Sequence, residues 1–133
     1  MSCQRERKIL KCNVCGLVIE TFCSDVPSIP HCCGEKMELV EAKSSDEGKE
    51  KHVPAGEIAP DGHLLVKVGK ETEHPMTNEH HICWIEWCYE NRCGRVYLDH
   101  TDKSQGHFCV KPVKGMKLRE YCNIHGLWEG EFK

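Results

Sequence analysis

The residues best suited to chemistry in this sequence are metal donors, and they fall into two sets of different composition. The first set contains only cysteines: Cys12, Cys15, Cys32 and Cys33. Four thiolates make a closed tetrahedral site that suits zinc or iron and can pass an electron. The second set is mainly imidazole, with one thiol: His52, His74, His80, Cys122 and His125. Five such donors leave one position of an octahedral ion vacant, where a substrate can bind.

The cysteine set has two halves with different spacing. Cys12-x-x-Cys15 precedes a glycine and places two thiolates on one tight turn, whereas Cys32 and Cys33 are adjacent. Neighbouring residues on a strand point to opposite faces, so we expect the backbone to bend at Gly34. A structural zinc site fits this spacing as well as an iron site does. A thioredoxin-type redox pair is disfavoured, because no βαβ pattern surrounds the motif.

In the histidine set, each member alone has an ordinary explanation as a surface or turn residue. The joint pattern is more specific, because a structural zinc site is usually complete with four ligands and five are present here. Met76 could supply the thioether of a copper site, which leaves a copper protein as an alternative to five-coordinate ferrous iron. His80 and His81 are adjacent in an expected strand, so only one of them should face the metal.

Composition limits the protein class. The chain has 133 residues, eleven cysteines and a formal net charge of −3. No apolar leader or membrane-spanning stretch is present, so we expect a cytoplasmic protein whose cysteines bind metal rather than form disulfides. The acidic balance disfavours a nucleic-acid partner but permits a small anionic substrate, because attraction depends on the local field.

The pattern along the chain predicts an all-β protein in three segments. Residues 1–41 form a small metal-dependent module, 42–49 a polar linker and 50–133 a larger domain. The domain shows short alternating strands without helical periodicity, which favours an antiparallel sandwich or barrel. The predicted strands lie at 63–69, 80–88, 95–99, 107–111 and 127–132. Alternation in the second of these predicts Ile82 and Trp84 on one face, and Cys83, Ile85 and Trp87 on the other.

Three motifs in the larger domain resemble the signature of superoxide reductases. They are Glu50-Lys51-His52-Val53-Pro54, His74-Pro75-Met76 followed by Glu79-His80, and Cys122-Asn123-Ile124-His125-Gly126-Leu127-Trp128. The N-terminal cysteines resemble those of desulforedoxin. The combination is similar to desulfoferrodoxin, the two-iron class of superoxide reductase, over nearly the whole chain and in the family's order.

This resemblance implies a function and a set of roles. The reaction is the one-electron reduction of superoxide to hydrogen peroxide at a non-haem iron bound equatorially by the four histidines and axially by Cys122. Glu50 resembles the carboxylate at the sixth position of the oxidised iron, and Lys51 the lysine that attracts superoxide. The four-cysteine site implies a second iron per chain. The family also implies an immunoglobulin-like sandwich after the desulforedoxin-like module, a homodimer, and a rubredoxin-like electron donor.

The sequence departs from the family pattern at several positions. His81 stands where an aromatic residue is expected, and the family spacing selects His80 as the ligand. Backbone amides near Asn123 and Ile124 should hydrogen-bond the Cys122 sulfur. Of the cysteines without a family role, Cys83 and Cys88 lie in the strand after His80 and suit small apolar positions. Cys88 and Cys93 could instead pair or bind a metal. The cysteines without a family role are Cys3, Cys23, Cys83, Cys88, Cys93 and Cys109.

Two other functions compete with this interpretation. An electron-transfer or zinc-stabilised binding module would hold the same metals without meeting a substrate. A dismutase would return half of the superoxide as dioxygen, but an axial thiolate disfavours re-oxidation of substrate by the ferric state. A nucleic-acid-binding cysteine finger is the least favoured alternative, because of the acidic charge.

Overall fold

The computed structural model describes residues 7–22, 28–45, 51–69 and 72–133. Within these ranges the chain forms strands and no helix, which confirms the all-β prediction. The chain divides into two compact units, Met1–Glu41 and Ala42–Lys133. In the described ranges, no helical segment has the length and apolarity that a membrane crossing requires.

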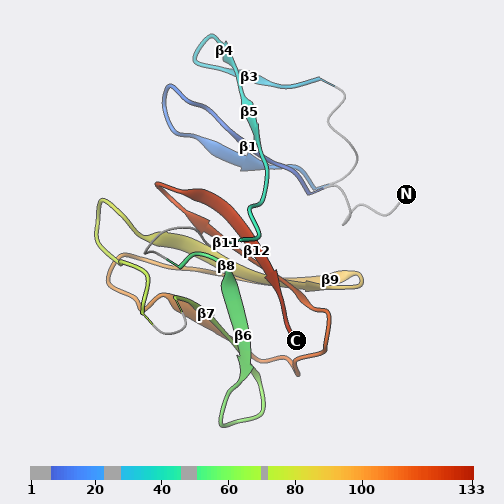
Figure 1. The fold of residues 1–133 in the computed structure, drawn as a ribbon. Helices are drawn as coiled ribbons and strands as arrows, with labels where there is room; N and C mark the ends of the chain where they lie inside the picture. Colours follow the sequence, from blue (N-terminus) through green and yellow to red (C-terminus); the bar gives the residue numbers. More distant parts are fainter. Residues whose placement is uncertain (1–6, 23–27, 46–50, 70–71) are drawn as a thin grey trace. The chain divides into compact units, whose positions relative to one another are not determined.

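The first unit contains a small antiparallel sheet and a short hairpin (Figure 1). The sheet has the order β2-β1-β5, formed by β1 (Ile9–Lys11), β2 (Val18–Glu20) and β5 (Glu38–Val40). The hairpin consists of β3 (His31–Cys32) and β4 (Glu35–Lys36). Among the described residues of the first unit, a small core cluster contains Leu10, Cys12 and Met37 with a few half-buried neighbours. So small an apolar core needs support, which a metal bound by the cysteines can supply.

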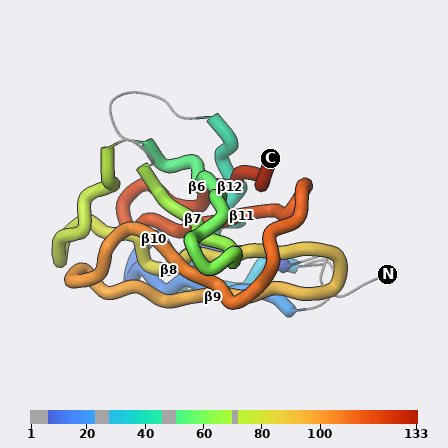
Figure 2. Tube along the Cα trace, turned by 90° about the horizontal axis from the view of Figure 1, so that it is seen from below, coloured from blue at the N-terminus to red at the C-terminus, as the bar shows by residue number. Residues whose placement is uncertain are grey.

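The second unit is a sandwich of two antiparallel sheets (Figures 1 and 2). The three-stranded sheet has the order β10-β7-β6, formed by β6 (Pro54–Ile58), β7 (Leu64–Val68) and β10 (Gln105–Phe108). The four-stranded sheet has the order β12-β11-β8-β9, formed by β8 (Ile82–Tyr89), β9 (Arg92–Tyr97), β11 (Lys117–Cys122) and β12 (Gly126–Glu131). After the β8–β9 hairpin the chain crosses over to pair β10 with β7. This seven-strand, three-plus-four Greek key is the immunoglobulin-like arrangement that was expected.

Alternating apolar residues fill the space between the two sheets. Leu64, Val66 and Val68 of β7 are fully buried, and they contribute to one core with Ile85 and Leu118 of the opposite sheet. Leu65 and Lys67, which lie between them on β7, are half-buried, so the period of two in burial matches a sheet with one face in the core.

One prediction about β8 is wrong. Ile82 lies in the same core as Ile85 and Trp87, rather than on the opposite face with Trp84. The register between β8 and β11 shifts so that Tyr121 pairs with Trp84, whereas Cys122 pairs with Ile82. This β-bulge places one extra residue in β8. As a result Ile82, the first residue of β8, faces the opposite side of the sheet from the one that simple alternation predicts.

The segment predicted as a linker begins inside the second unit. The amide of Lys43 donates to the Leu127 carbonyl at 3.0 Å, and the Lys43 carbonyl accepts from the Glu129 amide at 2.8 Å. Lys43 therefore pairs with β12 through Trp128. The later part of the predicted linker, residues 46–49, lies outside the described residues.

Candidate metal centres

The four cysteines of the first unit meet at one point. The sulfurs of Cys12, Cys15, Cys32 and Cys33 all lie within 4.8 Å of one another. The Cys15 and Cys32 sulfurs are 3.7 Å apart, and those of Cys32 and Cys33 are 3.8 Å apart. A tetrahedral ion with metal–sulfur bonds of about 2.3 Å requires sulfurs about 3.8 Å apart. The cluster therefore has the dimensions of a four-thiolate metal site.

Backbone conformation explains how the adjacent pair reaches one ion. Cys33 and Gly34 have φ values of 53° and 77°, so the chain bends sharply there, as expected.

The thiols of the cluster differ in pKa. The backbone amides of Cys15 and Val14 lower the pKa of Cys12 to about 7. Hydrogen bonds to the neighbouring sulfurs raise the pKa of Cys32 to about 12. A bound cation would bring all four to the thiolate state.

The four predicted histidines of the second unit form a closed cycle of rings. Ring centroids are 4.6 Å apart for His52 and His74, and 4.8 Å for His74 and His80. The cycle closes with 4.9 Å from His80 to His125 and 4.8 Å from His125 to His52. All four contacts are edge-on, with interplanar angles of 63–83°. Four imidazoles in this order surround a common centre, each contacting its two neighbours.

Cys122 joins this cycle from the end of β11. Its buried sulfur is 3.6 Å from Nε2 of His74 and 3.8 Å from Nδ1 of His125. Donor atoms of His52, His74, Cys122 and His125 lie within 4.8 Å of one another. His80 is not in the set defined by that 4.8 Å limit, but its ring contacts the rings of His74 and His125. The two donor sets predicted from spacing are therefore each brought together in space.

The Cys122 sulfur is held by the turn that follows it. The amide of His125 donates to this sulfur at 3.4 Å. Burial raises the pKa of the Cys122 thiol to about 11, while the amides of His125 and Ile124 oppose that rise. The donors are thus one residue later than expected, because the Asn123 amide instead bonds the His81 carbonyl at 3.2 Å. Gly126, with φ of 81°, then returns the chain into β12.

Polar groups behind two of the rings hold their orientation. Nδ1 of His74 lies 2.8 Å from the Pro75 carbonyl, so Nδ1 carries the proton and Nε2 is left as the donor that faces Cys122. Nδ1 of His52 is 3.6 Å from Oε1 of Glu120, a fully buried carboxylate on β11. Such partners set ring orientation and strengthen the imidazole as a ligand.

The choice between His80 and His81 is settled by one asparagine. Asn123 accepts from the His81 amide at 2.9 Å and donates to the Glu79 carbonyl at 2.9 Å, so it clamps the loop on both sides of His80. The His81 ring bonds the Thr77 carbonyl and lies outside the cycle. His80, and not His81, therefore belongs to the cluster.

An aromatic side chain closes one side of the cluster. Trp128 stacks on His52 with centroids 4.6 Å apart and an interplanar angle of 12°. The His125 carbonyl accepts from Trp128 Nε1 at 3.2 Å and from Lys43 Nζ at 3.1 Å. These bonds anchor the turn that carries His125. Lys43, Asn123 and Glu120 have no motif of their own, so only the register of β11 and β12 shows their role.

The two residues predicted to act on substrate differ in what the structure shows. Lys51 is exposed and immediately precedes the buried His52 in the chain. Glu50 lies outside the described residues.

A third donor group was not predicted. Asp61, His63 and His107 place their donor atoms within 4.8 Å of one another at the surface. His107 Nε2 is 2.8 Å from Asp61, and the His63 amide donates to the same carboxylate at 3.0 Å. These bonds lower the pKa of Asp61, the His63 amide most. His107 is distant in sequence from Asp61 and His63, and the pairing of β7 with β10 brings it to them.

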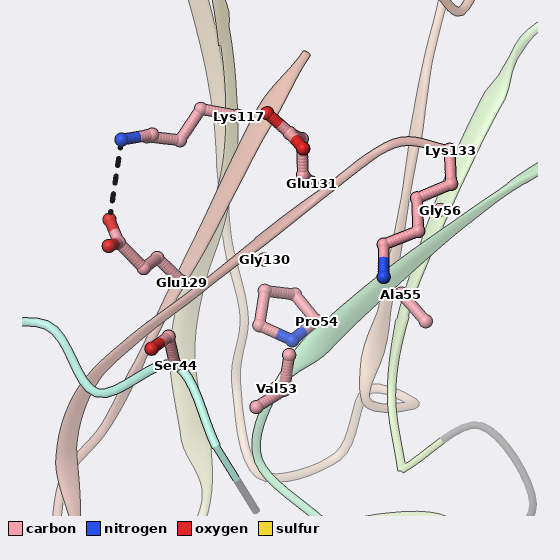
Figure 3. Close-up of a pocket in the computed structure, with 10 residues that line it drawn as sticks. All are labelled: Ser44, Val53, Pro54, Ala55, Gly56, Lys117, Glu129, Gly130, Glu131 and Lys133. Carbon is pink, nitrogen blue, oxygen red and sulfur yellow. Dashed lines mark ion pairs between the residues drawn. The ribbon is translucent and has the colours of Figure 1, made fainter. Parts of the chain in front are cut away.

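One hollow of the second unit is separate from the metal donors. Figure 3 shows it between β6 and the β11–β12 hairpin, with a volume of about 670 Å³. Lys117 and Glu129 form an ion pair of 3.7 Å at its rim. Among the residues that the structure describes, none of the predicted metal donors lines it.

The chain is all-β and carries a four-thiolate cluster in one unit. The other unit carries a cluster of four imidazoles and one thiolate. These features define a two-centre metalloprotein. The desulfoferrodoxin family model matches residues 44–131. The desulfoferrodoxin of Syntrophotalea carbinolica is 39% identical over 125 residues, which cover 93% of this chain and 95% of that protein. The chain belongs to the desulfoferrodoxin family.

Two further comparisons cover different extents of the chain. The superoxide reductase of Pyrococcus abyssi is 42% identical over 105 residues, covering 67% of this chain and 91% of that protein. The crystal structure of superoxide reductase from Treponema pallidum superimposes with a TM-score of 0.74 at 26% identity, covering 95% of this chain and 98% of that one. The fold of both units thus has a counterpart in one solved structure.

Proposed function

We propose that this chain is a superoxide reductase. The observation that carries this proposal is the closed cycle of four imidazoles with the Cys122 sulfur beside it, in a chain of the desulfoferrodoxin family. A relative that is 42% identical carries the name superoxide reductase. Five donors of this kind suit a mononuclear iron with one open position. Superoxide, a diatomic anion, is small enough to react there.

The ligands that we propose for the catalytic iron are the five clustered donors. The donor chemistry fits: Nε2 of His74 faces inward because its other nitrogen is bonded to a carbonyl, and the Cys122 sulfur lies against it. These residues would hold an iron that, when bound, would supply one electron to superoxide, and uptake of two protons would give hydrogen peroxide. The ligands are His52, His74, His80, Cys122 and His125.

The protein's own side chains would shape that reaction in three ways. The Cys122 thiolate donates electron density to the metal, and the amides that bond its sulfur moderate the donation. The exposed ammonium of Lys51 attracts the anionic substrate. Glu50 is assigned, from the family resemblance, as the carboxylate that covers the open position after oxidation.

For the first unit we propose a second iron, bound by Cys12, Cys15, Cys32 and Cys33. The sulfur spacings of 3.7 and 3.8 Å support a tetrahedral ion. This site has no donor-free position, so its role is structural support or electron supply. We assign residues 1–41 to this module, 42–49 to the connection and 50–133 to the catalytic domain.

Electron supply and assembly complete the proposal. We infer a rubredoxin-like donor, because each turnover consumes one electron that the catalytic site must recover. We also infer a homodimer, supported by four large apolar side chains exposed on the small first unit: Val14, Leu17, Phe22 and Leu39. We also propose a reducing compartment such as the cytoplasm, where cysteine thiols stay available to bind metal.

The test is to mix the reduced, iron-loaded protein with superoxide from pulse radiolysis and to measure hydrogen peroxide and dioxygen. We expect peroxide as the product, without release of dioxygen. Dioxygen equal to half of the superoxide consumed would indicate a dismutase. A colourless zinc protein, or iron that does not react, would indicate a binding or electron-transfer module. His74→Ala should abolish the reaction, and His63→Ala, outside the cluster, should not.

A further inference from the structure

Two cysteines without a family role face each other across the β8–β9 hairpin. Cys88 and Cys93 are register partners, and their sulfurs lie 2.7 Å apart. Directly paired residues of antiparallel strands have Cα atoms about 4.5 or 5.5 Å apart, and both values fall within the range of disulfides. The two sulfurs can therefore bond without any change of strand register. Figure 2 shows the two strands side by side along the sandwich.

The surroundings of the pair are polar and ordered. The Cys88 thiol donates to Oε1 of Glu86 at 3.4 Å, and Glu86 is almost fully buried. That carboxylate also accepts from Arg119 Nε at 2.6 Å and from Arg95 Nε at 3.1 Å. Arg95 in turn lies over the Trp84 ring, 4.1 Å from its centroid. This charged network fixes the Cys88 sulfur against its partner rather than leaving it to rotate.

Access to the two sulfurs is unequal. Cys93 is exposed, whereas Cys88 is half-buried behind it. A small oxidant from solvent meets Cys93 first, and the second thiol is already within bonding reach. This is the arrangement of an attacking thiol with a resolving thiol beside it.

We propose that Cys88 and Cys93 form a redox-active dithiol that hydrogen peroxide oxidises to a disulfide. The inference rests on the proposed function, because a superoxide reductase releases this oxidant from the same domain. Cys93 attacks one peroxide oxygen, the O–O bond breaks, and a sulfenic acid and one water form. The Cys88 sulfur then attacks the Cys93 sulfur, and the sulfenic hydroxyl leaves with the Cys88 proton as a second water. A small-molecule or protein dithiol reverses the step by thiol–disulfide exchange.

The outcome is one peroxide consumed and two thiols oxidised for each disulfide formed. The bond would also join the two strands of the hairpin covalently. Cys109 is an exposed free thiol in the same domain, and in the described strand registers it has no cysteine as its pairing partner, so it should not follow this route.

The experiment adds hydrogen peroxide directly to the reduced, metal-loaded protein, so that its result does not depend on the reductase reaction. Remaining thiols are alkylated and the chain is digested with trypsin, which cleaves after Arg92 and so separates Cys88 from Cys93. We expect a linked pair of peptides at stoichiometric peroxide, returned to separate peptides by dithiothreitol. Cys83 shares the Cys88 peptide, so the Cys83→Ala variant should still give the linked product.

Matched variants decide the assignment. Cys88→Ser and Cys93→Ser should each abolish the linked peptide, and Cys109→Ser should not. The reaction with superoxide should persist in both single variants. Failure of the dithiol proposal can therefore be distinguished from failure of the proposed function. The proposal is overturned if Cys88 and Cys93 stay alkylatable, if Cys109 is oxidised as fast as they are, or if dithiothreitol fails to reverse the linkage.

Discussion

His52 and Glu120 form a buried pair, with Nδ1 and Oε1 3.6 Å apart and both side chains almost inaccessible to solvent. Glu120 pairs with Ile85 in the four-stranded sheet, so its carboxylate points into the sandwich beneath the histidine cycle. A carboxylate behind a ligating imidazole holds the ring and raises its basicity. The catalytic centre is thus supported from the core and not only from its loops.

Replacing Glu120 with glutamine should weaken this support while keeping the side-chain volume. We expect iron affinity at the catalytic site to fall about 10–100-fold, the range found for such supporting partners. Chelator competition, followed in the visible spectrum, measures it. Glu57→Gln, at an exposed ion pair with Lys67, is the control and should leave affinity unchanged. Equal affinity in the two variants would contradict the supporting role of Glu120.

Removing the Lys51 ammonium should slow the encounter with superoxide. We expect the bimolecular rate of Lys51→Ala to fall about tenfold and to depend less on ionic strength, because the attraction is electrostatic. Iron content should not change. Lys114→Ala removes an equally exposed charge and should have little effect. A Lys51→Ala rate equal to that of the parent protein at low salt would exclude the steering role.

Metal uptake at the catalytic site should depend on pH through Cys122. The pKa of this thiol is raised to about 11, so the metal-free site is protonated at neutral pH and must release that proton on binding. Apparent iron affinity should therefore rise with pH between 6 and 9 and fall as the solution is acidified. In Cys122→Ser the slope should be shallower, and the thiolate-to-iron absorption band and reductase activity should disappear together. Activity without that band would show that Cys122 is not a ligand.

Disrupting the four-cysteine site should leave the chemistry at the second site intact. Cys15→Ser removes one of the four clustered sulfurs, so we expect loss of the first metal and a lower unfolding temperature of the first unit. The reaction of reduced protein with superoxide in a single turnover should be nearly unchanged. Calorimetry and stopped-flow absorption measure the two effects. A single-turnover rate that falls with the first metal would show that the two centres are coupled.

Ligand types and their spacing carried most of the predictable information. The bend at Cys33 and Gly34 could be expected from two adjacent cysteines that must reach one ion, and the selection of His80 followed from motif spacing. The alternating strands likewise indicated the sandwich. All of these are local features, expressed within a few residues of sequence.

What could not be predicted depends on strand register. The bulge that turns Ile82 into the core arises where β8 meets Cys122, and alternation within one strand carries no sign of it. Glu120, Lys43 and the Asp61 group acquire their neighbours only when distant strands pair. Sequence patterns identify donors well, but they do not identify the residues that hold those donors in place.

The order of the histidine cycle has a consequence for biosynthesis. Going round the ring, the imidazoles follow chain order, from His52 through His74 and His80 to His125, which closes back on His52. A nascent chain on the ribosome lacks both the closing ring and the Cys122 thiol until the last hairpin has emerged. Ferrous iron, which generates damaging radicals when loosely held beside peroxide, is therefore captured in full coordination only after translation of the sandwich is essentially complete.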